Sequence, residues 1–358
     1  MTAGSPDADC ADALTAAIEE ARAAGEPLCL RGAGTKTFLG EAGTGRALPV
    51  AEHRGVIAYE PSELVLTARA GTPLAEIETR LAEAGQMLPF EPPHFGATAT
   101  LGGTIACNLS GPRRPYTGAA RDFVLGTRII NGKGEILRFG GEVMKNVAGY
   151  DVSRLMTGAL GTLGVLLDIS LKVLPRPETE LTLAQRTSAQ QALDRMHTLS
   201  RLPLPVSASL YDGDTLFVRL SGTARGVDAA RDRVGGDEIA QGGELWSQAK
   251  EHRHSFFAPQ LPLWRLSLAS TAAPLGIEGQ WLYEWGGAQR WLLGHADVRA
   301  VRSLAQAHGG HATLYRGDPD REQVFHPLPA GLMNLHRRLK QAFDPHGIFN
   351  PGRMYREL

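Results

Sequence analysis

Apolar positions in the first half of the chain recur with the spacings of amphipathic helices and short strands. Residues 11 to 24 place Leu14, Ile18 and Ala21 on one helical face, and Gly25 is suited to end that helix. The pattern returns at residues 74–81, after Thr72, which fits an N-cap. Strands are predicted by apolar runs at residues 28–30, 64–70, 123–130 and 136–139.

Residues 165 to 173 alternate apolar and polar side chains. Val165, Ile169 and Leu171 point to one side of the extended chain, while Asp168 and Ser170 point to the other. A period of two over this length predicts a half-buried strand.

The proline-rich segment 174–177 marks a change in the order of elements. Residues 179–234 predict strand, helix, two strands and helix, an order found in ferredoxin-like units, and a looser set of elements follows. We therefore predict an α+β protein with a first domain at residues 1–175, a cap domain at 176–325 and a C-terminal helix and tail at 326–358.

Glycines recur where the short apolar runs of the first domain end. They cluster at residues 31–37, 98–118 and 158–165. Glycine has no Cβ and lets the backbone approach a ligand closely, although it also fills ordinary turns. Three such clusters in order, with apolar strands between them, favour a cofactor cleft lined by backbone.

The first cluster, at residues 31–37, could instead be the glycine motif of a Rossmann dinucleotide-binding site. Gly32 and Gly34 match the first two glycines of that motif, but Thr37 replaces the third. The sequence that follows resembles a loop and not the required helix. A turn whose free N–H groups bind phosphate oxygens is the better interpretation.

Composition excludes several classes of protein. The 358 residues include 37 Lys and Arg against 38 Asp and Glu, so the basic surface of a nucleic-acid-binding protein is absent. The 3 cysteines are too few and too scattered for a disulfide framework or an iron–sulfur cluster. No signal peptide or apolar membrane span is evident, so we expect a cytoplasmic protein that reaches the inner membrane only peripherally, through partners.

Histidines and aromatic residues of the predicted cap domain have no distinctive spacing. His252 and His254, or His308 and His311, lack a third ligand in register, so no metal site is predicted. An aromatic group is expected to pack in a core or an interface, or else to stack on substrate; it comprises Trp281, Tyr283, Trp285 and Trp291.

The glycine clusters, the Asp151-capped helix and the tail motif Asn350-Pro351-Gly352 together resemble the vanillyl-alcohol oxidase (PCMH-type) flavoproteins. The resemblance covers residues 28–174 and 343–354. It implies a PCMH-type FAD-binding domain of two subdomains, a cap domain, and a C-terminal segment that returns to the FAD domain. The implied cofactor-binding residues are Gly32, Ala33, Gly34, Thr35, Lys36, Thr37, Thr100, Leu101, Gly102, Gly103, Ser110, Gly111, Gly118, Asn146, Gly158, Gly161, Gly164, Val165 and Asn350.

Two departures from the family pattern affect the chemistry. Many relatives that bind flavin covalently carry a His where this chain has Thr35, so we expect non-covalent FAD. Catalytic relatives carry acidic and amide groups beside a His in the cap, where this chain reads Gly310-His311-Ala-Thr-Leu-Tyr-Arg316. His311 and Arg316 are the only catalytic candidates that this comparison leaves, and the catalytic residues stay unassigned.

Within the family, the resemblance is to flavoprotein subunits of bacterial glycolate-oxidising complexes. It implies oxidation of glycolate to glyoxylate, or relay of electrons from a partner flavin, beside a larger FAD-binding subunit and an iron–sulfur subunit. Two alternatives are an independent FAD-dependent oxidase of another 2-hydroxy acid or alcohol, and a non-redox scaffold subunit with a degenerate flavin site.

Overall fold

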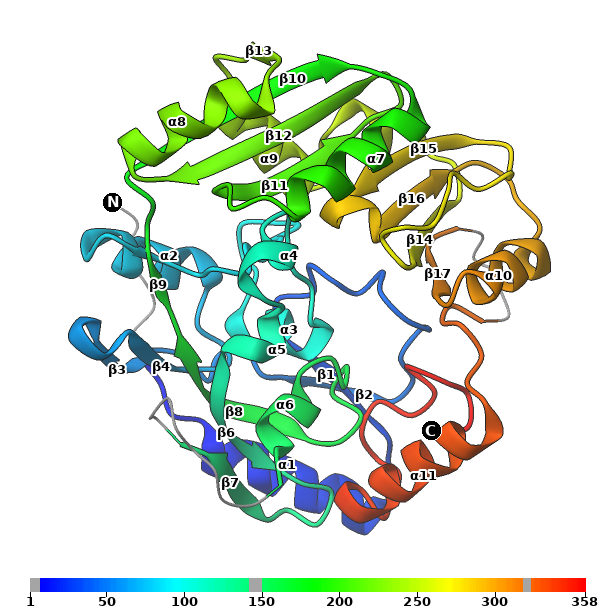
Figure 1. Ribbon diagram of the computed structural model, residues 1–358. Coiled ribbons are helices and arrows are strands. Elements are labelled where there is room, and N and C mark those ends of the chain that lie inside the picture. The colour runs from blue at the N-terminus through cyan, green and yellow to red at the C-terminus, as the bar shows by residue number, and fades with distance from the viewer. Residues whose placement is uncertain (1–6, 142–149, 318–322) are drawn as a thin grey trace.

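The computed structural model describes residues 7–141, 150–317 and 323–358. Its N-terminal part contains a five-stranded antiparallel sheet, in the order β3-β4-β8-β6-β7. A parallel pair, β1-β2, lies beside α1 (Ala11–Ala24), and β5 pairs with β9 (Figure 1). The strands are β1 Leu28–Arg31, β2 Arg46–Pro49, β3 Val56–Glu60, β4 Val65–Arg69, β5 Gln86–Met87, β6 Val124–Ile130, β7 Ile136–Gly140, β8 Val165–Lys172 and β9 Leu174–Pro175.

Short helices pack on this sheet or between it and the second half of the chain, and α3 carries Gly102 and Gly103. They are α2 Leu74–Glu83, α3 Leu101–Cys107, α4 Arg114–Thr117, α5 Ala120–Phe123 and α6 Val152–Met156. Asp151 caps α6 as predicted, since its carboxylate accepts from Arg154 N at 3.2 Å. The prediction for Thr72 was wrong: Pro73 is the N-cap of α2, and the Thr72 hydroxyl bonds to the backbone of Gly55.

The strand β8 differs from the half-buried strand that its period predicts. It is central in the sheet, and Val165 to Leu171 are all buried. The polar side of the strand is covered as well, because Asp168 pairs with His53 at 3.2 Å and with Arg128 at 3.1 Å. The polar positions of β8 therefore form a buried polar layer and not a solvent-exposed face.

The second half of the chain forms one eight-stranded antiparallel sheet, in the order β13-β10-β12-β11-β15-β16-β14-β17. The ferredoxin-like set and the looser set predicted after it are continuous, because β11 pairs with β15. The strands are β10 Thr179–Arg186, β11 Val206–Tyr211, β12 Thr215–Gly222, β13 Asp237–Glu238, β14 Leu263–Ser267, β15 Gln280–Glu284, β16 Gln289–Leu293 and β17 His311–Arg316.

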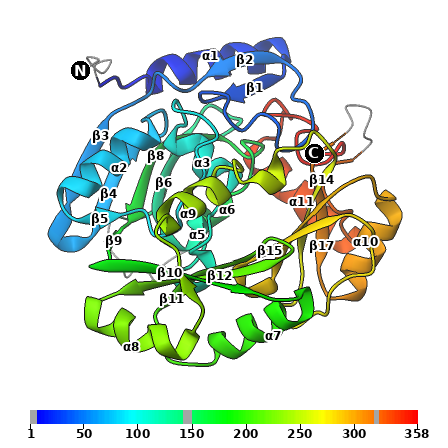
Figure 2. The ribbon, with the colours of Figure 1, turned by 90° about the horizontal axis from the view of Figure 1, so that it is seen from above.

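Helices lie on both faces of this sheet. The outer face is covered by α7 Ala189–Ser200, α8 Ala224–Val234 and α10 Val298–Ala307. The inner face turns toward the N-terminal part, and α9 (Gly242–Lys250), which the sequence pattern did not reveal, lies between the two (Figure 2).

The C-terminal segment returns to the N-terminal part, as predicted. Helix α11 (Ala330–Phe343) leads to a tail in which Phe349 forms a parallel bridge with Leu28 of β1. Lys340 fixes this return: its ammonium group donates to Asp344 at 2.8 Å and to the carbonyls of Thr162 and Phe349.

Charged and aromatic contacts hold the two halves together. Arg113 and Arg219 both bind Glu91, and Arg113 also bonds to Glu180 of β10. Trp285 is 6% exposed and donates from its indole to the Gly111 carbonyl at 3.1 Å. Tyr283, Trp285 and Trp291 are all buried, so these aromatic residues pack in the core and at the interface.

Candidate cofactor site

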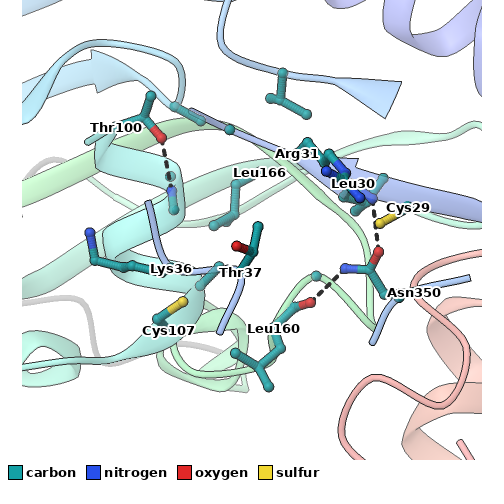
Figure 3. Close-up of a pocket in the computed structure, with 18 of the residues that line it drawn as sticks. Cys29, Leu30, Arg31, Lys36, Thr37, Thr100, Cys107, Leu160, Leu166 and Asn350 are labelled. Carbon is teal, nitrogen blue, oxygen red and sulfur yellow. Dashed lines mark hydrogen bonds between the residues drawn. The ribbon is translucent and has the colours of Figure 1, made fainter. Parts of the chain in front are cut away.

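A cavity of about 400 Å³ lies where β1, the loop after it, helix α3, residues 159–166 and the tail meet. This size is within the usual range for sites that hold a cofactor. Figure 3 shows Arg31 at the end of β1, Lys36 and Thr37 in the loop after it, and Thr100 and Cys107 at the two ends of helix α3. The cavity thus gathers segments that are hundreds of residues apart in the sequence.

The loop after β1 lines the cavity and carries free backbone N–H groups. Those of Gly32 to Lys36 make no hydrogen bond with any residue that the structure describes. Gly34 has φ +77°, a conformation that favours glycine. A Cβ on Gly32 would lie 2.6 Å from the Thr100 hydroxyl oxygen, so the loop needs glycine to approach α3. Free N–H groups on a concave turn are suited to phosphate oxygens.

The two glycines of helix α3 have different roles. Thr100 is the N-cap, and its hydroxyl accepts from Gly103 N at 3.3 Å. A Cβ on Gly102 would lie 2.7 Å from the Cβ of Ala70, so that glycine allows the helix to pack on the chain after β4. A Cβ on Gly103 would meet only the Thr100 hydroxyl, at 3.2 Å. Gly103 is therefore the position at which a side chain would enter the cavity.

Asn350 joins two walls of the cavity. Its Oδ1 accepts from Leu30 N at 2.8 Å, and its Nδ2 donates to the Leu160 carbonyl at 2.7 Å (Figure 3). A Cβ on the neighbouring Gly161 would lie 2.7 Å from this Nδ2. The side-chain amide of Asn350 thus positions the walls with both of its polar atoms.

The lining is electropositive. Its charged residues are Arg31, Lys36 and Arg353, with no Asp or Glu among the described lining residues. Burial lowers the pKa of Lys36, whose ammonium group donates to the His94 carbonyl at 3.1 Å. Arg353 is held by the carbonyls of Glu41 and Thr37. Burial also raises the pKa of Cys107 to about 11, so this lining thiol stays protonated.

The structure brings together most of the residues that the sequence selected. The cavity is lined by the loop Gly32, Ala33, Gly34, Thr35, Lys36 and Thr37, together with Thr100, Gly102, Gly103, Gly161, Gly164, Val165 and Asn350. Asn146 lies outside the described residues.

Other predicted residues lie outside this lining. Leu101 is fully buried in the hydrophobic core, and the Gly158 backbone N–H bonds to the Ile105 carbonyl. Gly118 ends α4, while Ser110 and Gly111 line a second, smaller cavity beneath the eight-stranded sheet.

Several lining residues were missed by the sequence reasoning. They include Cys29, Leu30, Arg31, Cys107, Leu160 and Arg353. Arg353 could have been found, because it follows Asn350-Pro351-Gly352 directly. The apolar residues had no signal, since a strand or helix residue that faces a cavity looks like any core residue in sequence.

The two catalytic candidates lie away from the cavity. Arg316 donates to the carbonyls of Phe257, Pro259 and Leu261, so its guanidinium holds a loop. His311 is the first residue of β17 and is not part of the lining. Within the part of the chain that the structure describes, no group of three or more His, Cys, Asp or Glu residues could hold a metal ion.

These residues fit FAD. The free N–H groups of the loop and the cations Arg31 and Arg353 complement a pyrophosphate, and the absence of carboxylates from the described lining removes repulsion. Gly103 leaves space in the cavity that a side chain would fill, and Gly161 allows the wall to pack closely on Asn350. The fold and the site thus define a flavoprotein of the PCMH type.

Comparison with known proteins identifies the family. Residues 8–140 match a family model described as an FAD binding domain, and residues 327–354 match one described as FAD linked oxidases, C-terminal domain. "Glycolate oxidase subunit GlcE" of Escherichia coli (strain K12) is 50% identical over 352 residues, which is 98% of this chain and 99% of that protein. The chain belongs to the family of FAD-linked oxidases.

Two other similarities cover less of the chain or have lower sequence identity. "Glycolate oxidase subunit GlcD" of Bacillus subtilis (strain 168) is 33% identical over 199 residues, 54% of this chain and 42% of that protein. A solved structure of alkyldihydroxyacetonephosphate synthase aligns with a TM-score of 0.64 at 16% identity, covering 95% of this chain and 74% of that one. At that identity the likeness shows the fold alone.

Proposed function

We propose that this chain is an FAD-binding subunit of a glycolate oxidase complex, in which glycolate is oxidised to glyoxylate. The observation that carries the proposal is the cavity with its free N–H groups, in a chain that is 50% identical to a glycolate oxidase subunit over nearly its whole length. FAD, when bound, supplies the two-electron acceptor, while the chain's residues bind and position it.

The proposal includes non-covalent FAD, because Thr35 and not His stands at the end of the loop and no His is among the described lining residues. We also propose the division into an FAD domain at residues 1–175, a cap at 176–325 and a C-terminal segment at 326–358. This agrees with the change of sheet between β9 and β10.

The proposed partners are a larger FAD-binding glycolate oxidase subunit and an iron–sulfur subunit, with peripheral membrane association through them in the cytoplasm. Similarity to two different glycolate oxidase subunits, GlcE and GlcD, supports a complex of several chains. In the described part of the chain, no helix is long and apolar enough to cross a membrane.

Purification of the untagged chain from its native host tests this proposal. We expect the visible absorption of oxidised flavin in the chain, co-purification of a larger flavoprotein and an iron–sulfur protein, and bleaching of the flavin when the complex is mixed anaerobically with glycolate. Rapid, complete reduction by glycolate of the flavin in the isolated chain, without partners, would favour the independent oxidase. A folded chain that takes up no added FAD would favour the scaffold subunit.

A further inference from the structure

Helix α11 carries an apolar stripe that is open to solvent. Leu332, Leu335, Leu339 and Ala342 follow one another at intervals of three, four and three residues, which places them on one side of an α-helix. Such spacing normally marks the side that packs against a core. Here Leu332 and Leu335 are 43% and 51% exposed and Ala342 is exposed, while Leu339 is partly covered by the N-terminal core. We call this stripe the outer face of α11.

A different face of α11 packs on the protein. Met333 and Lys340 are the buried residues of the helix. The Lys340 ammonium group donates to Asp344 and to the Thr162 carbonyl at 2.8 Å, and to the Phe349 carbonyl at 2.7 Å. The helix is therefore fixed in place before any partner binds. Docking on its outer face would cost little conformational entropy on this side of an interface.

The same contacts place α11 against a wall of the cofactor cavity. Thr162 follows Gly161 directly, and Phe349 precedes Asn350; Gly161 and Asn350 both line the cavity. Figure 1 shows the helix at the edge of the molecule, beside the C-terminal tail. A partner on the outer face would be separated from the cavity wall by about one helix, roughly 10 Å thick. This position suits a partner that exchanges electrons with the cofactor.

The surroundings of the apolar stripe are basic. Residues 330–343 include no Asp or Glu. Arg338, three residues after Leu335, flanks the stripe, is exposed, and forms no ion pair or hydrogen bond with any residue that the structure describes. Arg337 is also exposed, and its Nη1 donates to Asn334 Oδ1 at 3.2 Å. Free cations beside an apolar stripe complement a partner that carries carboxylates beside its own apolar side chains.

The outer face differs from the other exposed apolar positions. Elsewhere in the described parts of the chain, the large apolar side chains that are exposed each lie alone on a separate segment: Ile57, Ile136, Tyr150 and Val298. Single apolar residues on a surface are ordinary and require no partner. Two neighbouring leucines in helical register with unpaired cations form a continuous patch, which is the pattern of an interaction site.

A second helix fits the outer face better than a membrane does. A helix that lies in a lipid interface inserts a broad apolar face. The exposed stripe of α11 is narrow, and the face beside it is fixed to the protein by Lys340. Alternating intervals of three and four residues are the spacing with which one helix packs along another.

We propose that the outer face of α11 docks an acidic amphipathic helix of a partner protein. Leu332 and Leu335 pack against the apolar side of that helix, and Arg337 and Arg338 pair with its Asp or Glu side chains. That the helix belongs to another subunit of the glycolate oxidase complex rests on the function proposed above. The docking face itself rests on exposure, spacing and charge.

Photocrosslinking of the full FAD-containing chain in its native host locates the partner. A photoreactive phenylalanine analogue replaces Leu335 in one strain. In the other it replaces Ile57, which is 46% exposed on β3 at the opposite side of the molecule (Figures 1 and 2). We expect position 335 to crosslink to a segment of a co-purifying subunit that has apolar residues at helical spacing and Asp or Glu beside them, as mapped by mass spectrometry. Position 57 should give no such crosslink.

Charge and size variants measure the contribution of each group. Leu335→Glu should weaken association with that subunit roughly tenfold to a hundredfold, because burial of a leucine contributes that much. Arg338→Glu should weaken it roughly tenfold at low salt and less at high salt. Ile57→Glu and Arg225→Glu, at exposed positions of β3 and α8, are the matched controls and should change nothing. Flavin absorbance and circular dichroism show that each variant is folded, and mass photometry of the purified complexes measures association.

The outcomes separate this inference from the proposed function. A complex that stays intact and oxidises glycolate in both Leu335→Glu and Arg338→Glu would overturn the docking face and leave the function standing. A crosslink to a second copy of this chain, or binding of the isolated chain to phosphatidylglycerol vesicles that Leu335→Glu abolishes, would also overturn it. A mapped acidic helix in a complex that does not oxidise glycolate would support the face and reject the function.

Discussion

The guanidinium of Arg219 on β12 contacts both carboxylate oxygens of Glu91, at 2.9 and 3.0 Å. Arg113 binds the same carboxylate from the N-terminal side, at 3.1 Å. Glu91 thus sits between two cations from the two halves of the molecule. This cluster joins the eight-stranded sheet to the N-terminal part and so bears on stability.

Glu91→Gln should lower the free energy of unfolding by roughly 3 kcal/mol, because it leaves the largely buried guanidinium of Arg219 without a counter-charge and leaves Arg113 with Glu180 alone. Chemical denaturation measures this loss. Asp232→Asn is the matched control, since it breaks an exposed pair with Arg231 and should cost less than about 1 kcal/mol. Equal losses for the two variants would contradict the role assigned to the cluster.

Stability should fall in acid, and Glu91 should contribute to that fall. Burial alone raises the pKa of Glu91, but Arg219 and Arg113 outweigh it and hold the pKa below its ordinary value of 4.5. The folded state then binds fewer protons than the unfolded state, so this stabilisation is present above pH 4.5 and disappears as the pH falls through the folded pKa. Melting temperatures from pH 7 to pH 3 should show a steeper decline for the wild type than for Glu91→Gln. Parallel curves would argue against this assignment.

Gly103→Val should abolish FAD binding and leave the fold intact. The added side chain enters the cavity, while the backbone of Gly103 is helical and needs no positive φ. Flavin absorbance per protein and circular dichroism measure the two effects. Gly243→Val, at an exposed glycine of α9 with no atom within 4 Å of its Cβ position, should keep FAD. Full flavin occupancy in Gly103→Val would show that the cofactor avoids this wall.

Acid precipitation should release the flavin into the supernatant. Thr35 has no nucleophilic ring nitrogen, and the lining thiol of Cys107 has a pKa raised to about 11, which keeps it protonated. The yellow colour should therefore leave the denatured protein, as measured by absorbance after centrifugation. Colour that stays in the pellet would reveal a covalent bond to the chain.

Asn350→Ala should weaken both the fold and FAD binding. It leaves Leu30 N and the Leu160 carbonyl without partners, which costs about 2–4 kcal/mol for two buried groups. Asn350 also has φ +41°, a conformation that Asn tolerates better than Ala. Denaturation and FAD titration measure the losses. Asn334→Ala, on the exposed face of α11, should change neither, and an equally mild effect at Asn350 would reject its structural role.

The sequence by itself determined the local elements and the cofactor class. Helix α1 has the bounds that periodicity predicted, and the glycines at 32, 34, 103 and 161 line one cavity. These features follow from properties of single residues: side-chain period, capping, and the conformational freedom of glycine.

The tertiary structure decided what depends on neighbours distant in the chain. It showed that Asp168 and Ser170 face a buried layer, that Gly102 packs on Ala70 while Gly103 faces the cavity, and that Trp285 is internal. His252 was weighed in sequence only as a metal ligand, and Arg265 gave no signal, because the absence of a counter-charge is a property of the space around a side chain. Only the pairing of β14 with β16 and β17, beneath α9, places that cation and that base at one cavity.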